Sequence, residues 1–319
     1  MAITRYLKIG EESEYAVEAS EYAETLDPES ASIDPAGDDK LIYEGMGGLD
    51  RRAGLGVYST AGDITIPLDD LATGWFWKWA LGNYEVTGTD DGEGNITAPY
   101  THIFSPATTP LMHSFSAKIG KDVFEHVFLG NVVSSISLEV ANEWALMTVS
   151  TVGAKDKKST LDENIEYTEG TYFTAPMASL RKNNVDISAS INSLSLSIET
   201  GANIEDSAGF GSRFPTKAFR GALVVNLEAE LGFDSVEELI AFWGDDEGPS
   251  TTNIDEFSYT LSFGDNLDLI FPRLVYTASG QPAEGRENIT QSVTARALYD
   301  DVNKEGPIIV SLTNNKESY

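Results

Sequence analysis

The feature that most constrains this chain is a strict alternation of polar and apolar residues in several short segments. Residues 135–140 read Ser-Ile-Ser-Leu-Glu-Val, and residues 193–198 read Ser-Leu-Ser-Leu-Ser-Ile. Because successive side chains of a β-strand point to opposite faces, this period of two predicts strands with one buried face. Further strand candidates, mostly bounded by Gly, Asn, Asp or Pro, are residues 63–67, 111–119, 145–152, 222–230, 257–263, 267–271, 288–298 and 308–313.

The connections between these segments are too short or too polar to be the long helical crossovers that parallel strands need. The pattern therefore predicts a mainly β protein with antiparallel sheets, and it argues against a parallel α/β fold. Only two segments are typical of helices.

The first helix is expected to begin near Asp69 and Asp70, whose carboxylates suit the positive end of a helix dipole, and to end at Gly82. Trp75 and Trp79 lie four residues apart and so share a face. Bulky aromatics surround more of this helix than one face needs. They either fill the core or contact another subunit, and the four concerned are Trp75, Phe76, Trp77 and Trp79.

The second helix carries a capping-box pattern in Ser235 and Glu238. Leu239 and Trp243 belong to its apolar stripe, and Gly244 marks its end. The residues expected to pack the two helices or to contact another subunit are therefore Trp75, Trp79, Leu239 and Trp243.

The surroundings of the two helices are alike. Each helix follows a strand, and each is followed by an acidic, turn-rich loop, at residues 89–94 and 244–248, and then by several strands. The arrangement occurs twice at a separation of roughly 145–160 residues, which favours a duplication over two unrelated β domains. We predict two tandem modules, residues 1–160 and 161–319, with an N-terminal arm of about 1–55 and a linker of about 154–184 that cross between them.

The charge of the chain is strongly negative, with 51 acidic residues against 21 basic ones and a formal net charge of −30. Such a chain is a poor binder of DNA, because DNA affinity comes mostly from Lys and Arg that neutralise phosphates. It has no cysteine, which excludes disulfides and thiol chemistry. The acids are spread over loops, termini and linker alike, which favours adaptation of the whole surface to a salt-loving host such as a halophilic archaeon.

Candidate chemical sites are weak. The histidines, His102, His113 and His126, lack partners at ligand spacing, although His113 and His126 could meet across a hairpin and bind a divalent metal. Strand histidines are more often neutral and carry no ligand. No Gly-x-Ser-x-Gly elbow is present, and residues 209–213 lack the closing glycine of a phosphate loop.

Asp90, Asp91 and Glu93 offer oxygen ligands beside turn glycines and are the weak candidates for a calcium site. They lack the EF-hand register, so a solvated hairpin tip is the favoured interpretation. We predict no catalytic residues, no cofactor and no metal, and thus that the chain is not an enzyme. No apolar run reaches the about 18 residues that a membrane helix needs, so no membrane association is expected.

Several segments, taken in order, resemble the tail tube proteins (major tail proteins) of long-tailed, siphovirus-like viruses. Residues 6–17 resemble a Gly-x-Glu-Ser-x-Tyr-Gly opening, with Ala16 where glycine is usual. Residues 211–221 resemble a Gly-Ser-Arg-Tyr-Pro connector. The remaining matching segments are residues 101–106, 111–119, 125–140, 147–156, 289–300 and 308–314.

The resemblance implies a β-sandwich or barrel-like module with one flanking helix, here present twice. In such proteins subunits form stacked rings whose inner strands join into a continuous β-barrel around a lumen. Relatives with one module form hexamers and relatives with two form pseudo-sixfold trimers, so a homotrimer is favoured over a homohexamer. The implied partners are further copies of the chain, the tape measure, terminator and baseplate proteins, and DNA that passes through without specific binding.

The sequence thus predicts a structural protein of the virion tail tube, assembled in the host cytoplasm, that forms a negatively lined conduit for genome delivery. The alternative is another acidic β-sandwich module of a virion or cell surface, in a baseplate, decoration or adhesion protein. Two acidic loops, about 82–100 and 244–256, are expected to connect successive rings. The ring-stacking candidates in them are Thr89, Asp90, Asp91, Glu93, Asp245, Asp246 and Glu247.

Overall fold

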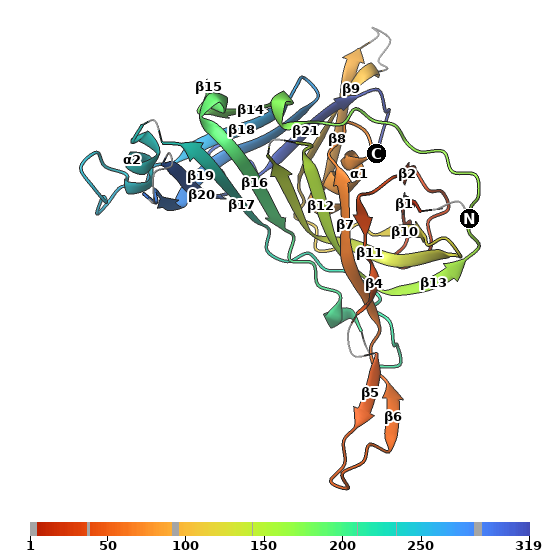
Figure 1. Cartoon of the computed structure of the whole chain (residues 1–319). Coiled ribbons are helices and arrows are strands. Elements are labelled where there is room, and N and C mark those ends of the chain that lie inside the picture. Colours follow the sequence, from red (N-terminus) through yellow and green to blue (C-terminus); the bar gives the residue numbers. More distant parts are fainter. Residues whose placement is uncertain are drawn as a thin grey trace.

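A computed structural model of the chain describes residues 5–36, 39–90, 96–141, 143–208, 210–233, 235–283 and 289–319. The fold is mainly β, and every pairing between described strands is antiparallel, which confirms the fold class predicted from the alternating pattern (Figure 1). The helices in the described residues are α1 (Thr73–Leu81), α2 (Glu237–Trp243) and three short 3-10 turns at Ala175–Met177, Ser188–Ser190 and Glu205–Ser207.

The strands fall in both halves of the chain. In order they are β1 (Leu7–Glu11), β2 (Glu24–Leu26), β3 (Ser30–Ala31), β4 (Asp34–Ala36), β5 (Lys40–Tyr43), β6 (Arg52–Leu55), β7 (Ser59–Pro67), β8 (Gly82–Asp90), β9 (Ile96–Pro106), β10 (Phe115–Gly120), β11 (Glu125–Val140), β12 (Leu146–Gly153), β13 (Lys155–Ser159), β14 (Ala178–Lys182), β15 (Val185–Asp186), β16 (Ile191–Glu199), β17 (Val224–Gly232), β18 (Phe257–Phe263), β19 (Leu267–Gly280), β20 (Thr290–Ala297) and β21 (Ile309–Asn314).

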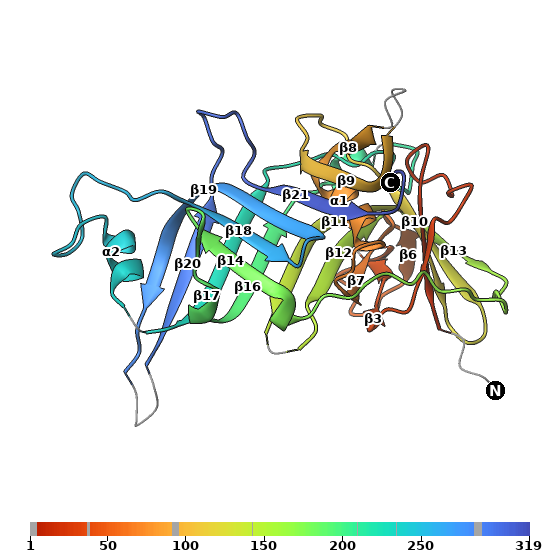
Figure 2. The ribbon, with the colours of Figure 1, turned by 90° about the horizontal axis from the view of Figure 1, so that it is seen from above.

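One long ladder of strands runs through the whole chain, in the order β19–β20–β17–β16–β11–β12–β7, with β3 and β4 on the far edge of β7 (Figure 2). The pairing of β11 with β16 joins the first half to the second. This ladder is the scaffold on which the other elements are arranged, and we refer to it as the main ladder.

The side chains of the main ladder alternate as the sequence predicted. On β11, Ile136 and Leu138 are buried, while Ser135 and Ser137 are only partly covered. On β16, Leu194, Leu196 and Ile198 are buried in the same way. One face of the sheet therefore faces the core, and the other carries small polar residues.

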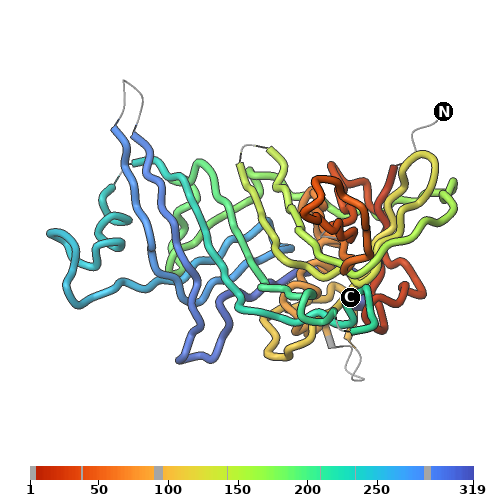
Figure 3. Tube along the Cα trace, turned by 90° about the horizontal axis from the view of Figure 1, so that it is seen from below, coloured from red at the N-terminus to blue at the C-terminus, as the bar shows by residue number. Residues whose placement is uncertain are grey.

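A second layer covers the core side of the main ladder. It contains β1, β8, β9, β10, β14, β18 and β21, together with the first parts of β11 and β19. The later parts of these two long strands belong to the main ladder. β21 pairs with β19 of the second half and also with β9 of the first half. The last residues of the chain consequently lie against the first half, where the C mark falls in Figure 3.

The core is continuous across both halves. A single cluster of buried side chains includes Ile136 and Met147 from the first half and Leu227 and Phe271 from the second. Residue 160, where the predicted modules divide, lies just after β13, and the predicted linker of 154–184 contains β13 and β14. Within it Phe173 is buried, and its N–H donates to Leu68 O at 2.9 Å.

Helix α1 begins at Thr73, slightly later than predicted. Asp69 still serves its start, because its Oδ1 accepts hydrogen bonds from the N–H of Leu71 at 3.1 Å and of Thr73 at 2.9 Å. The helix ends as predicted at Gly82, which adopts a left-handed conformation with φ of 93° and donates its N–H to Lys78 O. Its four aromatic side chains are all buried in the chain's own core, namely Trp75, Phe76, Trp77 and Trp79.

Helix α2 departs from the prediction at its start. The expected capping box is wrong, because the helix begins at Glu237 and has no side-chain cap. Glu238 instead binds Lys182 and accepts a hydrogen bond from Tyr276, so the neighbouring strands use its carboxylate. The predicted end at Gly244 is confirmed by its left-handed φ of 72°.

The acidic segment 82–100 is not a long loop, contrary to expectation. β8 and β9 form a hairpin in register from Gly82↔Pro106 to Asp90↔Ile96, with one irregularity near Thr87. Alternation in this segment is masked by threonines, glycines and charged residues, because both strands lie largely outside the core. The strands β1, β13 and β14 were also missed, because each has five residues and so shows too little alternation to be recognised.

The pKa of Asp69 gives a test of this packing. Burial raises it from 3.8 to about 6, against the opposing effect of backbone N–H donors. The folded state therefore holds this proton more tightly than the unfolded state, and the resulting stabilisation is complete below about pH 4 and lost as the pH rises through 6. Asp69→Asn keeps the acceptor oxygen without the charge. We expect it to be more stable than the parent at pH 7 by about 2–3 kcal/mol and similar near pH 4.

Thermal or urea unfolding at pH 4 and pH 7 measures this difference. Equal losses of stability at both pH values would show that the charge of Asp69 is not disfavoured in the folded chain.

Candidate assembly site

The solvent side of the main ladder is a sheet of short polar side chains, which we call the polar face. One row crosses its strands by direct pairing from β7 to β20. Thr65 and Thr148 in this row lie 3.1 Å apart at their hydroxyl oxygens. The full row is Thr65, Thr148, Ser137, Ser197, Asn226 and Arg296.

Carboxylates on the polar face outnumber cations. The acids that project from it are exposed and come from four strands. Arg296 is the one Lys or Arg that it carries along β7, β12, β11, β16, β17 and β20. Along the same six strands the exposed acids are Asp63, Glu139, Glu199, Glu228 and Glu230. Such a surface offers hydroxyl groups and negative charge but almost nothing that would hold a phosphate.

A hairpin formed by β5 and β6 projects away from the rest of the chain (Figure 1). Its apolar residues are exposed along both strands and the turn between them, which is unusual for a surface hairpin. These residues, which we call the hairpin arm, are Leu41, Ile42, Tyr43, Met46, Leu49 and Leu55. Exposed apolar side chains gathered in this way are typical of surfaces that contact another chain.

The base of the hairpin arm is fixed by Arg213, which comes from the second half. Its Nε donates to Gly56 O at 3.2 Å, and its Nη2 donates to Asp39 O at 3.2 Å and to Asp39 Oδ2 at 3.3 Å. The guanidinium also lies 5.1 Å from the centre of the Tyr58 ring. Arg213 belongs to the Gly-Ser-Arg-Phe-Pro segment that the resemblance selected, and this contact gives that segment a physical role.

The Glu12 carboxylate gives the opening segment, residues 6–17, a physical role as well. It is buried and accepts hydrogen bonds from Ala16 N–H, Ser114 Oγ, Ser116 Oγ and Gly130 N–H, at 2.8–2.9 Å. Ala16 has a φ of 58°, in the left-handed region that favours glycine. That conformation explains why glycine suits this position.

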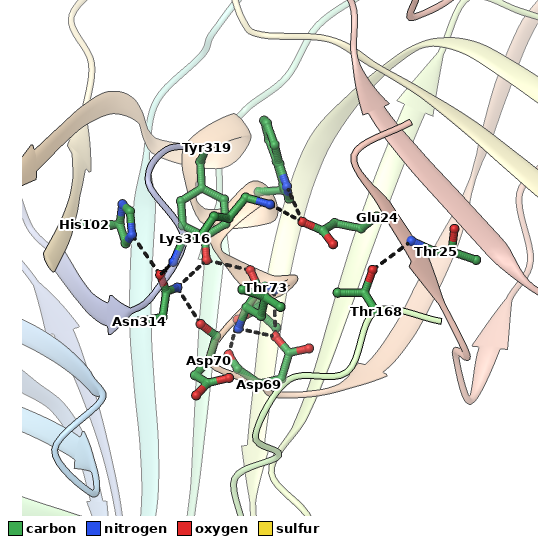
Figure 4. Close-up of polar contacts among 12 residues, drawn as sticks. Glu24, Thr25, Asp69, Asp70, Thr73, His102, Thr168, Asn314, Lys316 and Tyr319 are labelled. Carbon is green, nitrogen blue, oxygen red and sulfur yellow. Dashed lines mark hydrogen bonds and ion pairs between the residues drawn. The ribbon is translucent and has the colours of Figure 1, made fainter. Parts of the chain in front are cut away.

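A buried polar network attaches the chain's last residues to the first half (Figure 4). Asn314 lies at its centre and uses all four of its hydrogen-bonding positions. Its Oδ1 accepts from His102 Nε2 at 3.0 Å and Lys316 N–H at 2.8 Å, and its Nδ2 donates to Asp70 O at 2.6 Å and Tyr319 Oη at 2.7 Å. Since Tyr84 Oη lies 3.0 Å from His102 Nδ1, the geometry fits a neutral imidazole with its proton on Nε2. Burial lowers the pKa of His102 accordingly.

Tyr319 fills the space above the start of α1. Its hydroxyl donates to Leu71 O at 2.6 Å, and Lys78 Nζ donates to Tyr319 O at 3.0 Å. A Cβ on Gly74 would lie 2.2 Å from the Tyr319 ring, so this close approach requires glycine. Lys316 adds an ion pair with the buried Glu24. Together these contacts tie the second half to the N-terminal strands and to α1.

The predicted ring-stacking residues lie in two separate places. Thr89 pairs with Thr97 near the end of the β8–β9 hairpin, and Asp90 pairs with Ile96, while Asp91 and Glu93 lie outside the described residues. Asp245, Asp246 and Glu247 are exposed after α2, at the far end of the second half (Figure 1). Of the weak calcium candidates Asp90, Asp91 and Glu93, the structure therefore describes only the backbone of Asp90.

The helix residues singled out from the sequence differ in burial. Trp75 and Trp79 are buried, and Trp79 stacks on Phe115 with ring centroids 4.3 Å apart. Leu239 and Trp243 of α2 are only partly covered within one chain. Surfaces of α2 consequently remain available to a neighbour, whereas those of α1 do not.

The histidines do not form a shared site. His113 Nδ1 lies 3.2 Å from Glu11 Oε1, and His126 Nε2 lies 2.6 Å from Asp156 Oδ2. His102 is part of the network around Asn314. Across the described ranges no group of three or more His, Cys, Asp or Glu is placed to hold a metal ion. Among the same residues no helix is long and apolar enough to cross a membrane.

A continuous antiparallel sheet with open edges and a projecting apolar arm characterise a β protein that acts by contact with other chains. The family model described as "Phage tail tube protein" matches residues 4–297, so the chain belongs to the phage tail tube protein family. It is therefore a structural component of a virion tail. No curated protein matches the chain.

Sequence reasoning missed the hairpin arm, Arg213 and Asn314. The arm carried a signal, because residues 40–55 hold several large apolar side chains without a helical or buried-strand pattern. Arg213 and Asn314 lie in segments that the resemblance selected, but nothing in the sequence indicated their contacts with Asp39 and Asp70, which lie more than 100 residues away.

Asn314→Ala tests the network. The substitution removes the acceptor of the buried His102 Nε2 and the donor to Tyr319 Oη. We therefore expect a loss of about 1–3 kcal/mol in the free energy of unfolding and faster proteolysis of residues 315–319. The matched control is Thr313→Ala, which removes a half-exposed hydroxyl that lies 3.0 Å from Thr101 Oγ1. Equal unfolding midpoints for the two variants would show that Asn314 does not fasten this segment.

Proposed function

We propose that the chain polymerises as stacked rings into the viral tail tube and that the genome passes along the lumen into the host. The observation that carries this proposal is the polar face. It runs through both halves, and along β7, β12, β11, β16, β17 and β20 it has one Arg against five carboxylates. Turned toward a lumen, it would let DNA slide without being held.

The duplication supports a trimer of pseudo-sixfold symmetry. In the first half β7 pairs with β12 and β12 with β11, and in the second half β17 pairs with β20 and β20 with β19. The hairpins β10–β11 and β18–β19 extend the two sets in the same way. Two equivalent modules in one chain would give a ring of three chains the six positions that single-module relatives fill with six.

The hairpin arm is the element best suited to connect rings. It extends beyond the body of the protomer, and Arg213 donates hydrogen bonds to its base. Apolar side chains on it would be buried when they reach a neighbouring ring, at roughly 25 cal/mol for each Å² removed from water. The acidic loop tips near Thr89 and Asp245 remain secondary candidates for the same contact.

Further parts of the proposal follow from the tube. The tape measure, terminator and baseplate proteins would contact its ends, assembly would occur in the host cytoplasm, and the tail would be of the siphovirus-like type. The net charge of −30 supports a salt-loving host, such as a halophilic archaeon, because self-repulsion between protomers is screened in molar salt.

Negative-stain electron microscopy of the purified chain tests the function. We expect tubes in molar salt, with three chains in each ring slice, and shorter or fewer tubes in low salt. Six chains per ring would contradict the duplication, and tubes indifferent to salt would contradict the salt-loving host. Protein that stays monomeric under all salt conditions would contradict the function itself.

The hairpin arm is tested in the same assay. Ile42→Ser, Tyr43→Ser and Leu49→Ser together should leave folding unchanged, because all three side chains are exposed, yet should stop assembly at single rings. Val123→Ser, at an exposed apolar residue outside the arm, is the matched control. Tubes of normal length from the triple variant would exclude the arm from ring stacking.

The polar face makes a prediction about DNA. Glu228→Lys and Glu230→Lys together place two cations in the proposed lumen, so tubes should retain DNA oligonucleotides, and retention should fall steeply with added salt. Glu228→Gln with Glu230→Gln should retain none. Reversal of Glu21 and Glu317, which are exposed outside this face, is a second control. Equal retention by both reversed pairs would indicate that the polar face does not line the lumen.

A further inference from the structure

The seam between the two halves is a β-ladder of known register. β11 and β16 pair from Ser135↔Glu199 to Val140↔Leu194. Thr200 N–H donates to Ser134 O at 3.0 Å and continues the same ladder. This seam joins one half to the other as a subunit contact would, and it supplies a template for the contact between chains.

Both strands of the seam have counterparts in the other half. β19 is the counterpart of β11, because β11 forms a hairpin with β10 as β19 does with β18. Each strand also has one register shift in its later pairing. The shift lies between Val133 and Ser135 in β11 and between Tyr276 and Ala278 in β19. Ala278 therefore takes the place of Ser135. Helix α1 packs on β11 as α2 packs on β19.

The counterpart of β16 is the segment formed by β3 and β4. β16 pairs with β17, and the segment 30–36 pairs with β7, which is the counterpart of β17. Glu199 pairs with the first residue of β17, and Ala36 pairs with the first residue of β7. The corresponding positions are Ser193 and Ser30, Leu194 and Ala31, Ser197 and Asp34, Ile198 and Pro35, and Glu199 and Ala36.

These two counterparts are the open edges of the main ladder. From Val275 to Gly280, β19 pairs with β20 on one side, and in the described part of the chain it has no strand on the other. Within the same part, β3 and β4 pair with β7 alone. The edges lie at opposite ends of the ladder, so one chain cannot join its own two edges.

We propose that β19 of one copy pairs antiparallel with β3 and β4 of the next copy, in the register of the internal seam. Ala278 then lies opposite Ala36, Gly280 opposite Asp34, and Pro282 opposite Ser32. This inference rests on the ring assembly proposed above and specifies its contact. It commits the open edges to a second copy of the chain, because the chain already makes the equivalent contact within itself.

The residues at the proposed contact suit such a seam. Ala278, Ala36 and Gly280 are small, so the strands can approach without a clash, and Ala278 and Pro282 are exposed in the single chain. Counting from the hydrogen-bonded pair of Thr200 and Ser134, the pair Ala278↔Ala36 is one of the non-hydrogen-bonded positions, where Cα atoms lie about 4.5 Å apart.

Two prolines explain how the open edges avoid wrong pairing. Pro282 falls at a non-hydrogen-bonded position, where its missing N–H is not needed by the seam. Pro35 falls at a hydrogen-bonded position and withholds one N–H, while Ser279 N–H can still donate to Pro35 O. Proline on an exposed edge disfavours pairing in other registers, which protects the free chain from aggregation.

Disulfide cross-linking in assembled tubes tests the register, and the absence of native cysteine makes it clean. Ala36→Cys with Ala278→Cys should give, on oxidation, covalent oligomers that end at the ring size, because directly opposed positions in a sheet meet disulfide geometry. Ser32→Cys with Ala278→Cys is four positions out of register and should stay monomeric. Ser137→Cys with Ser197→Cys, opposed in the internal seam, should cross-link within one chain.

The outcomes separate this inference from the function. If tubes form and the internal control pair at 137 and 197 cross-links, but the pair at 36 and 278 stays monomeric or the pair at 32 and 278 cross-links instead, the register is overturned and the tube remains. If no tubes or rings form in any salt, both the proposed function and the register fail.

Discussion

The constraint on which this structure depends is the hydrogen-bonding demand of sheet edges. A ladder that runs from β19 to β3 and β4 leaves a row of backbone N–H and C=O groups at each end. The chain satisfies this demand once within itself, where β11 meets β16. The same demand at the two outer edges would be met in the closed ring of copies that we propose, because closure removes every edge.

A protomer that closes a ring must keep its two halves in a fixed orientation, since a small rotation at the seam would move the outer edges apart. The shared core and the network around Asn314 provide that rigidity. Asn314 and Tyr319 come from the end of the chain, but their partners belong to β9 and to the start of α1. The second half is thus joined to the first by two strand pairings. β16 pairs with β11 in the main ladder, and β21 pairs with β9 in the layer on the other side of the core.

The sequence predicts what depends on local pattern. Alternation located β11, β16, β17 and β20, and glycines located the ends of both helices, because these signals reflect strand geometry and the left-handed conformation directly. It could not predict how Glu238 is used, since Lys182 and Tyr276 compete for the carboxylate that a cap would need. Nor could it select which acids lie on the polar face, because that depends on the register between strands rather than on any one segment.

The polar face changes how the charge of the chain is understood. Along β7, β12, β11, β16, β17 and β20 only five of the 51 acidic residues project from it beside one Arg, and most of its positions there are Ser, Thr or Asn. A lumen lining therefore does not account for the net charge of −30, most of which lies elsewhere on the surface. In molar salt the Debye length is about 3 Å, so carboxylates there would repel DNA only near contact. Under those conditions the near absence of Lys and Arg matters more than the presence of acids. A hydroxyl-rich sheet stays hydrated and offers a passing phosphate no cation to bind.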